Sequence, residues 1–467
     1  MLKRLLTLTL LAMAAACGGG MLQPDLQRLY MTAKPAPQPP VILIPGLLGS
    51  KLRDRQTGEE VWPGGWHDIL FSSYPALRQE IDPVSLELAP SKLEAFDITE
   101  AALGQNIYRP IMRTLEEVGG YQRSLPGVPA GVLDRRYYVL SYDWRQDNVQ
   151  STRALHALIG QIQRDYKDPK LKVDIIAHSM GGLVARYYLR YGTKDVLNGN
   201  DFSITHAGAA NVNKLLLLGT PNLGSIESLH SFLNGFRILA GRIPTEDLAT
   251  MPSGLQLFPH PLNVWLIKPD GSELVRDLFD VETWRRFQWS VFDPKVMGRM
   301  RKQTSATAAD DIALRQRFFA KQLERARRFV WSLSVKEPTT PIRYIVFGGA
   351  CELTPARVLV EEDGGDSLIR MYPEDIRQPM KGVAYDRLML EPGDGTVTKA
   401  SLLARASLDP SVPRHRYSFF PLAYAFFLCE THKQLTNNIN FQDNLLNALL
   451  ERNMEFSTAL PLRRGGK

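Results

Sequence analysis

Cysteine is scarce in this chain of 467 residues, which contains only Cys17, Cys351 and Cys429. No cluster of histidine, aspartate and cysteine residues has the spacing of a metal site. We therefore expect no metal ion, and we expect no organic cofactor either. If the chain is exported, Cys351 and Cys429 are free to form a disulfide bond, and two buried free thiols are the alternative.

The chain also lacks a strong excess of charge of one sign. It has 56 basic and 49 acidic side chains, a net charge of +7, and the two signs are interspersed along most of the sequence. This pattern argues against a nucleic-acid partner. No internal repeat is found, and after the N-terminal region no apolar run is long enough to span a membrane. A hydrophobic content of 44% is ordinary for a globular protein with a large core.

The N-terminus has the pattern of an export signal, residues 1–17. A short basic start, MLKR, is followed by an apolar run too short for a spanning helix and by small residues before Cys17. Residues 14–17 resemble a bacterial lipobox, in which Cys17 is diacylated; cleavage near Cys17 without a lipid and an uncleaved anchor are the alternatives. Gly18 is not the aspartate that favours inner-membrane retention, so we expect the outer membrane. Residues 18–40, rich in proline and alanine, are a predicted tether.

Five apolar runs closed by turn residues predict buried strands, at 41–46, 136–143, 172–179, 214–221 and 342–349. Helical patterns follow the second and the third run, at 151–166 and 180–192. Near-continuous apolarity indicates burial on both faces, as in a parallel sheet. Strands that alternate with helices predict an α/β fold with a doubly wound, mostly parallel sheet. The active site of such a sheet lies beyond the carboxyl ends of its strands.

Two intervals of the predicted domain, 41–460, are too long to be simple connections. We call the first, about 51–133, the lid region and the second, about 222–340, the cap. The lid region holds apolar side chains that indicate either a loop with its own small core or a mobile, membrane-touching lid: Trp62, Trp66, Ile69, Leu70 and Phe71. The cap ends in a predicted helix, 310–333, with one apolar stripe and many arginines. We expect a solvated basic face there, and attraction to anionic lipid is the alternative.

Ser179 follows the third predicted strand and precedes a helix, in the hexapeptide AHSMGG. This context is typical of a nucleophile elbow, a turn so tight that the residues two before and two after the serine must be small. Ala177 adds only one methyl group to the usual glycine, and Gly181 keeps the other side open. A serine that merely caps the helix is the alternative.

A serine nucleophile needs a histidine base and a carboxylate that orients the histidine. In α/β-hydrolases these partners follow the serine in the order acid, then histidine, which excludes the histidines that precede the fifth strand. His432 follows a strand-like run and precedes a helical pattern, where a catalytic histidine is expected. His415 is the alternative base.

Asp394 is the predicted acid, because the glycines that flank it in EPGDGTVTKAS let the backbone turn sharply at the end of the sheet. A plain Asp-Gly hairpin turn is the alternative interpretation of this segment. Four other aspartates follow the fifth strand and are rival candidates: Asp363, Asp366, Asp375 and Asp386.

Two backbone N–H groups are expected to stabilise a developing oxyanion. One belongs to Met180, directly after the nucleophile. The other lies in the loop after the first strand, where Gly46 allows the chain to double back and Leu47 offers its N–H. The identity of the side chain at position 47 is secondary for this role.

In this order, the segments resemble the lecithin:cholesterol acyltransferase family of α/β-hydrolases, which includes lysosomal phospholipase and bacterial relatives. The resemblance spans about 41–445 and is carried by VILIPGLLGSKL, SYDWR, AHSMGGLVARYYL, LGTPNLGS, SGLQLFP, PGDGTVTKAS and THKQL. It implies that Ser179 is the nucleophile, Asp394 the acid and His432 the base. Leu47 and Met180 would be the oxyanion donors.

The resemblance also bears on other residues. Cys351 and Cys429 flank Asp394 much as a second disulfide of the family does, although the local registers differ. Asp143 and Arg145 match a family signature and are interpreted as a buried charged pair on the floor of the site. The lid region departs from the family: animal members staple the lid with a disulfide, and no cysteine occurs between 51 and 133.

The leading hypothesis is an exported serine-dependent acyl hydrolase or acyltransferase. It would take an acyl group from an ester lipid, with glycerophospholipid as the first candidate, and pass the group to water or an acceptor alcohol. The expected partners are this lipid and the membrane surface, reached through lipidated Cys17 and the lid region. A triacylglycerol lipase or general esterase is the alternative within the same chemistry. A non-catalytic lipid-binding lipoprotein is the alternative from another class.

Overall fold

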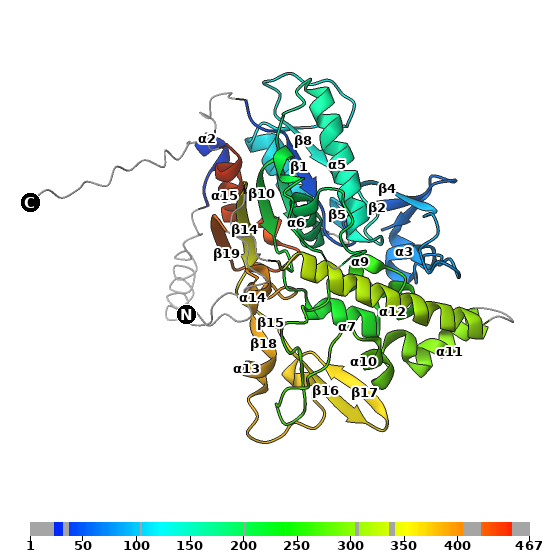
Figure 1. Ribbon diagram of the computed structural model, residues 1–467. Helices are drawn as coiled ribbons and strands as arrows, with labels where there is room; N and C mark the ends of the chain where they lie inside the picture. Colours follow the sequence, from blue (N-terminus) through cyan, green and yellow to red (C-terminus); the bar gives the residue numbers. More distant parts are fainter. Residues whose placement is uncertain are drawn as a thin grey trace, which may run out of the picture.

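The computed structural model describes residues 23–30, 37–102, 105–199, 201–238, 240–303, 308–335, 341–404 and 422–450 (Figure 1). The predicted export signal with Cys17, parts of the predicted tether and the alternative base His415 lie outside these residues. Within the described ranges, no helix is both long enough and apolar enough to cross a membrane.

The centre of the molecule is a seven-stranded sheet in the order β19-β14-β10-β9-β1-β8-β7. Every neighbouring pair of strands in it is parallel. The strands are β1 (Val41–Ile44), β7 (Gln122–Arg123), β8 (Arg136–Val139), β9 (Val173–His178), β10 (Val212–Leu218), β14 (Arg343–Gly349) and β19 (Tyr424–Leu428). All five predicted strands lie in this sheet, and β7 and β19 form its two edges. The predicted doubly wound, parallel α/β fold is confirmed.

Helices cover both faces of this sheet (Figure 1). One face packs against α5 (Asn148–Asp165) and α6 (Met180–Tyr191), and the other against α4 (Arg109–Arg113), η2 (Thr114–Val118) and α15 (Ile439–Leu450). Alternate residues of β1 point into the two cores: Ile42 and Ile44 into the first, Val41 and Leu43 into the second. Burial on both faces explains why the strands are continuous apolar runs in the sequence.

The lid region contains a three-stranded antiparallel sheet, in the order β3-β2-β4, and short helices. Before α4 its elements are β2 (Ser50–Asp54), β3 (Glu60–Trp62), α3 (Trp66–Phe71), η1 (Pro75–Leu77), β4 (Leu93–Ile98), β5 (Ala101–Ala102) and β6 (Gln105–Asn106). The predicted apolar cluster divides into two parts. Trp62 and Ile69 are buried in the main core, whereas Trp66 and Phe71 are exposed.

The cap is mostly helical but also contains a β-hairpin, β11–β12. Its elements are α7 (Ile226–Asn234), β11 (Phe236–Ile238), β12 (Gly241–Ile243), α8 (Thr245–Leu248), α9 (Pro252–Leu255), β13 (Leu266–Ile267), α10 (Val281–Arg286), η4 (Ser290–Phe292), α11 (Pro294–Gln303) and α12 (Ala308–Ser332). The predicted apolar stripe of α12, which includes Phe319 and Leu323, is buried. On its basic face, Arg325 lies 2.6 Å from a carboxylate oxygen of Asp147 and 2.8 Å from one of Asp195. These ion pairs fasten the cap to the core domain.

Smaller elements lie between β14 and β19 and lead to the predicted acid. They are β15 (Glu352–Pro355), β16 (Val358–Asp363), β17 (Asp366–Arg370), η5 (Pro373–Asp375), α13 (Tyr385–Met389), β18 (Leu390–Gly393) and α14 (Lys399–Leu402). β15 pairs with β18, which ends one residue before Asp394. The remaining short helices are α2 (Leu26–Tyr30), η3 (Ala209–Asn211) and η6 (Leu435–Asn437).

Candidate active site

Ser179 occupies the tight turn between β9 and α6. Its backbone has φ 52° and ψ −124°, a strained combination for a residue with a side chain. The turn is anchored because the Ser179 N–H donates to the carbonyl oxygen of Leu218, 2.7 Å away. A Cβ atom at Gly181 would lie 2.6 Å from the carbonyl oxygen of Pro45, whereas Ala177 is buried in β9 opposite Ile44. The tight side of this elbow is therefore at Gly181, and an alanine fits at position 177.

Replacing Gly181 with alanine is expected to lower the free energy of unfolding by about 1–3 kcal/mol or more, because its methyl group meets backbone atoms that cannot yield. The matched control is Gly160→Ala in helix α5, where the nearest atom to a new Cβ is the tip of Arg164 at 3.7 Å. That substitution should stabilise the helix by about 0.5–1 kcal/mol. Urea unfolding measures both changes, and equal stability of the two variants would contradict the steric explanation.

Ser179, His432 and Asp394 form one chain of hydrogen bonds. His432 Nε2 lies 3.0 Å from Ser179 Oγ, and His432 Nδ1 lies 2.8 Å from Asp394 Oδ2. Ser179 follows β9 and His432 follows β19 of the central sheet, whereas Asp394 follows β18, which pairs with β15 outside that sheet. The structure thus brings together the three residues that the sequence predicted. Such a chain can remove the proton of the serine hydroxyl as the oxygen attacks a carbonyl carbon.

Asp394 lies in a tight turn of the kind that a plain Asp-Gly hairpin also predicts. Gly393 and Thr398 form an isolated β-bridge around it, and the side chain of Asp394 is only 2% exposed. The backbone N–H groups of Thr396 and Val397 donate to Asp394 Oδ1, at 3.0 and 2.7 Å. They leave Oδ2 to face His432. The hairpin turn and the contact with His432 therefore coexist at the same residue.

The two predicted oxyanion donors lie beside Ser179 on neighbouring segments. Met180 is the first residue of α6, and Leu47 lies in the turn that follows β1, which the Gly49 N–H closes on the carbonyl oxygen of Gly46 at 3.0 Å. Within the described part of the chain, neither the Leu47 nor the Met180 N–H is engaged by an acceptor. A Cβ atom at Gly46 would lie 2.8 Å from the Cβ atom of Ser179, so this turn and the elbow are in direct contact.

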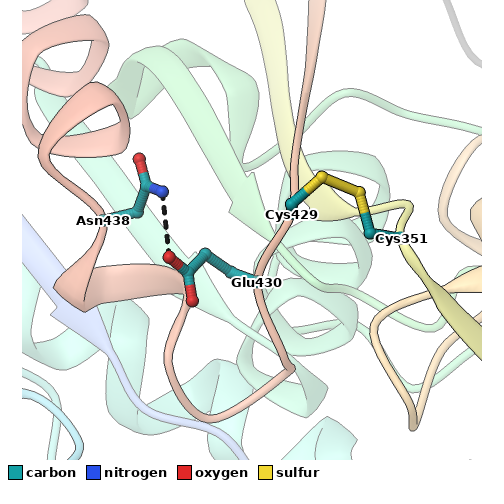
Figure 2. The surroundings of a disulfide bond; sticks show 4 residues. All are labelled: Cys351, Cys429, Glu430 and Asn438. Atoms are coloured by element: carbon teal, nitrogen blue, oxygen red, sulfur yellow. Dashed lines mark hydrogen bonds between the residues drawn. A yellow bond between two sulfur atoms is a disulfide. The ribbon is translucent and has the colours of Figure 1, made fainter. Parts of the chain in front are cut away.

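A disulfide bond joins Cys351, just after β14, to Cys429, just after β19 (Figure 2). Both residues are exposed, unlike the buried thiols of the alternative interpretation. Beside the disulfide, Asn438 donates to a carboxylate oxygen of Glu430 at 3.0 Å. These contacts hold the ends of the segment that carries His432 between β19 and α15.

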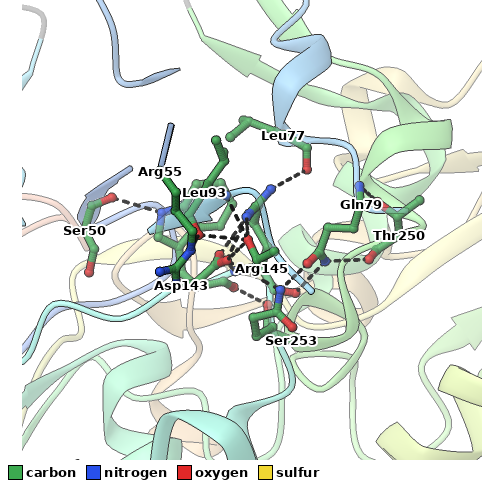
Figure 3. Close-up of polar contacts among 12 residues, drawn as sticks. Ser50, Arg55, Leu77, Gln79, Leu93, Asp143, Arg145, Thr250 and Ser253 are labelled. Carbon is green, nitrogen blue, oxygen red and sulfur yellow. Dashed lines mark hydrogen bonds and ion pairs between the residues drawn. The ribbon is translucent and has the colours of Figure 1, made fainter. Parts of the chain in front are cut away.

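The buried Arg145 and the partly buried Asp143 form a bidentate ion pair, with nitrogen–oxygen distances of 2.8 and 2.7 Å (Figure 3). Arg145 also donates to the carbonyl oxygen of Leu77, and Gln79 bridges the backbone of Arg145 and Thr250. The pair therefore ties the lid region and the cap to the loop after β8. The pair does not line the cavity beside Ser179, so its interpretation as the floor of the site needs correction. Of residues 143–145, Trp144 alone lines that cavity.

A cavity of about 1070 Å³ opens against Ser179 and His432. Its apolar wall comes from the lid region and the cap and includes Trp62, Ile69, Phe232, Ile238, Leu248 and Met251. Another part of its lining is charged and includes Glu227, Asp375, Arg237, Arg242 and Lys433. Both the lid region and the cap line this cavity. They are joined by a backbone hydrogen bond in which the N–H of Arg242 donates to the carbonyl oxygen of Ser72 at 3.2 Å. The site can therefore hold a molecule with an apolar part and a charged part.

Two cationic side chains of this lining, among the described residues, have no hydrogen-bonded or ion-paired protein partner. Within the described residues, neither Arg237 nor Arg242 makes a hydrogen bond or an ion pair through its guanidinium group. Burial lowers the pKa of Arg242 below its usual value, the positive charges of Arg299 and Arg237 lower it further, and the negative charge of Glu246 opposes the shift in part. The nearby pair Arg299–Glu246 is complete, at 2.8 Å. An anion would therefore complement the β11–β12 hairpin.

Residues 93–268 match the model of the lecithin:cholesterol acyltransferase family. Over this segment, the predicted family resemblance is confirmed. A search of the curated proteins finds no match. Among solved structures, a chain of the Tle4–Tli4 complex is similar with 17% identity and a TM-score of 0.53, over 88% of this chain and 98% of its own. EstA from Clostridium botulinum (13% identity, TM-score 0.35, 92% and 91% coverage) and Staphylococcus hyicus lipase (13%, 0.34, 92% and 98%) also match.

The first of these structures shares the α/β-hydrolase fold with this chain. Together with the match to the lecithin:cholesterol acyltransferase family, the fold supports an enzyme that acts on lipid esters. In the described part of the chain, no group of three or more histidine, cysteine or acidic side chains is placed to hold a metal ion.

Two glycines of the site were missed by reasoning from the sequence. A Cβ atom at Gly219, after β10, would lie 2.9 Å from His432 Nδ1, and one at Gly349, the last residue of β14, would lie 2.6 Å from the Cβ atom of Asp394. A side chain at Gly219 would collide with His432, and one at Gly349 would collide with Asp394, so both positions require glycine. The signal was present, since each glycine ends an apolar run, in LLLLG and IVFGG.

Proposed function

We propose that the protein is a serine-dependent acyl hydrolase or acyltransferase that forms an acyl-enzyme from an ester lipid. The hydrogen-bonded chain of Ser179, His432 and Asp394 beside a part-apolar, part-charged cavity is the observation that carries this proposal. A fluorophosphonate probe should label the protein once per chain, and the Ser179→Ala variant should not be labelled.

In the proposed reaction, Ser179 Oγ attacks the ester carbonyl carbon while its proton passes to His432 Nε2. The N–H groups of Leu47 and Met180 donate to the carbonyl oxygen as it gains negative charge. The tetrahedral intermediate then collapses, the ester C–O bond breaks, and His432 returns the proton to the leaving alcohol. An acyl-enzyme remains on Ser179.

The second half-reaction repeats these steps with another hydroxyl group. Water or an acceptor alcohol loses its proton to His432 and attacks the acyl carbon, and Ser179 recovers the proton as it leaves. Water gives a free fatty acid, whereas an alcohol gives a new ester. The large, partly apolar cavity supports both outcomes, and products formed with and without an added alcohol distinguish them.

Glycerophospholipid is the proposed substrate, and the unpaired arginines of the β11–β12 hairpin support it. A phosphodiester carries the negative charge that Arg237 and Arg242 lack as a partner, and guanidinium groups bind phosphate by paired, charge-assisted hydrogen bonds. The apolar wall would take the acyl chains. A triacylglycerol has the acyl chains without the charge and would leave the arginines unused.

Replacing Arg237 and Arg242 together with glutamine is expected to lower kcat/KM for phospholipid vesicles by about 10- to 100-fold, the worth of one or two charge-assisted bonds. Cleavage of triglyceride should stay within about threefold of wild type. The control is Arg301→Gln with Lys302→Gln, which removes two exposed positive charges from α11, away from the cavity. Equal losses on both lipids would favour the triacylglycerol lipase instead.

Export and lipid anchoring through Cys17 are also proposed, on the signal-like residues 1–17. In a bacterial host, Cys17→Ser should abolish labelling of the protein by radioactive palmitate, because the acceptor thiol is lost. Cys351→Ser is the matched control. It should keep the label, because Cys17 is intact and Cys351 lies in the disulfide bond rather than at the lipidation site. Persistent labelling of Cys17→Ser would remove the lipoprotein proposal.

A further inference from the structure

The turn that carries Leu47, residues Pro45–Ser50, is held by four aromatic side chains. Two tyrosines and two tryptophans bond to its backbone: Tyr142 Oη to the Pro45 oxygen (2.8 Å), Tyr108 Oη to the Gly46 nitrogen (2.8 Å), Trp62 Nε1 to the Leu48 oxygen (2.9 Å) and Trp144 Nε1 to the Ser50 oxygen (3.0 Å). The Gly49 oxygen accepts from the Thr99 N–H. Leu48 has φ 64°, so these contacts hold the turn in a strained conformation.

One of the four, Tyr108, also contacts a residue outside the turn. Its hydroxyl oxygen lies 2.8 Å from Nδ1 of His178, the residue directly before Ser179. His178 Nε2 in turn lies 3.2 Å from the carbonyl oxygen of His432. A continuous line of hydrogen bonds thus runs from the turn, behind Ser179, to the backbone of the predicted base.

The direction of each bond in this line follows from elementary chemistry. A carbonyl oxygen only accepts, so His178 Nε2 must carry the proton that it donates to His432. His178 is buried and its pKa is lowered to about 3, by burial first and by the nearby His432 second, so the ring is neutral and Nδ1 has no proton. Nδ1 therefore accepts from the Tyr108 hydroxyl. The Tyr108 oxygen then accepts from the Gly46 N–H.

We propose that Tyr108 and His178 are positioning residues that lock the oxyanion turn and the base His432 into one geometry around Ser179. Neither is hydrogen-bonded to Ser179 Oγ or to the ring of His432, although both line the cavity and the His178 ring lies beside the His432 ring, with centroids 4.9 Å apart. Tyr108 fixes the Gly46 N–H, one peptide before the Leu47 N–H, and His178 fixes the carbonyl group of His432. The inference rests on the proposed serine-hydrolase function and deepens it, because it names residues that set the alignment of donor, nucleophile and base.

Loss of the Tyr108 hydroxyl would leave two buried groups without partners, the Gly46 N–H and His178 Nδ1. The turn and the His178 ring could then shift to find others. Because a displacement of about 1 Å between reacting groups costs on the order of 10²-fold in rate, Tyr108→Phe should lower kcat by about 10- to 100-fold. KM should change little, since Tyr108 supplies no charge or apolar group that the phenylalanine lacks.

The experiment compares Tyr108→Phe with Tyr121→Phe in the full chain. Both tyrosines are buried in the same core cluster, and within the described residues the Tyr121 hydroxyl has no hydrogen-bond partner. Three quantities are measured: kcat for each active site titrated with a fluorophosphonate, the rate constant of inactivation by that probe, and Tm. We expect both rates to fall in Tyr108→Phe and to stay within twofold of wild type in Tyr121→Phe.

Several outcomes would overturn the inference. If Tyr108→Phe loses titratable sites but keeps its kcat for each remaining site, the hydroxyl only stabilises the fold. If its rates match those of Tyr121→Phe while Ser179→Ala is inactive, the proposed function survives and the positioning role does not. If Ser179→Ala is fully active, the proposed function itself fails.

A second variant cuts the same line at another point. His178→Gln should lower kcat for each titrated site by a similar factor, and it tests the inference even if Tyr108→Phe does not fold. The double variant should lose little more than either single variant, because both break one continuous line. Fully additive losses would show that the two residues act separately and would overturn the proposed coupling.

Discussion

Ser179→Ala is expected to lower kcat for ester cleavage by roughly 10⁴- to 10⁶-fold, the cost of removing one member of a nucleophile–base–acid unit. Without Oγ, no acyl-enzyme can form, and His432 can only activate water directly. Residual turnover above the uncatalysed rate should persist, because the Leu47 and Met180 N–H groups and the cavity are unchanged. The measurement is fatty-acid release from phospholipid vesicles under conditions where KM is also determined.

The matched control for this variant is Ser228→Ala. Ser228 lies on the wall of the same cavity but is not part of the hydrogen-bonded chain. Its kcat should stay within about threefold of wild type. If Ser179→Ala cleaved esters as fast as Ser228→Ala, the nucleophile would lie elsewhere, and the interpretation as a non-catalytic lipid-binding protein would gain support.

The residues nearest the chemistry could be predicted because their signals are local. Ser179 lies between an apolar run and a helix, and Asp394 lies between two glycines. In each case the backbone geometry that the role requires restricts the residues beside it, so a few positions suffice to recognise it. The central strands of the sheet could be predicted as well, because burial on both faces requires continuous apolar runs.

The residues that hold this chemistry in place could not be predicted. Tyr108 reaches Gly46 and His178 only because the lid region folds back over the turn after β1. Nothing beside Tyr108 in the sequence indicates that contact. Trp62 was assigned either to a small core within the lid region or to a membrane-touching lid, yet it lies in the main core, where its indole N–H bonds to Leu48 and its ring packs against Trp144. Such contacts depend on tertiary packing, for which a single sequence has no periodic signal.

The edges of the sheet show the same limit. β7 consists of Gln122 and Arg123 and carries no apolar pattern, because it lies at an exposed edge and needs only its backbone to pair with β8. The β11–β12 hairpin could not be predicted either, since each of its strands has three residues, too few to show an alternation of apolar and polar side chains. Its arginines line a cavity that exists only once the lid region and the cap have met.

The second large effect concerns Asp394, where the surrounding backbone dictates how an asparagine would sit. The N–H groups of Thr396 and Val397 both donate to Oδ1, so the amide oxygen of an asparagine must stay there to satisfy them. The amide NH2 would then occupy the place of Oδ2 and donate to His432 Nδ1. His432 would have to accept at Nδ1 and carry its proton on Nε2, which faces Ser179.

Asp394→Asn is therefore expected to lower kcat/KM at neutral pH by roughly 10⁴-fold, although the side chain keeps its size and its bonds to Thr396 and Val397. In the wrong tautomer His432 cannot take the Ser179 proton, and the positive ring formed during attack would lose its carboxylate. Asp386→Asn, the same change at an exposed rival aspartate, should stay within twofold of wild type. Tm and the cavity's affinity for a non-hydrolysable ether lipid should change little in either variant. A loss at Asp394 that tracked a fall in Tm would mean that the turn had unfolded, and unchanged kcat/KM would assign the acid to another residue.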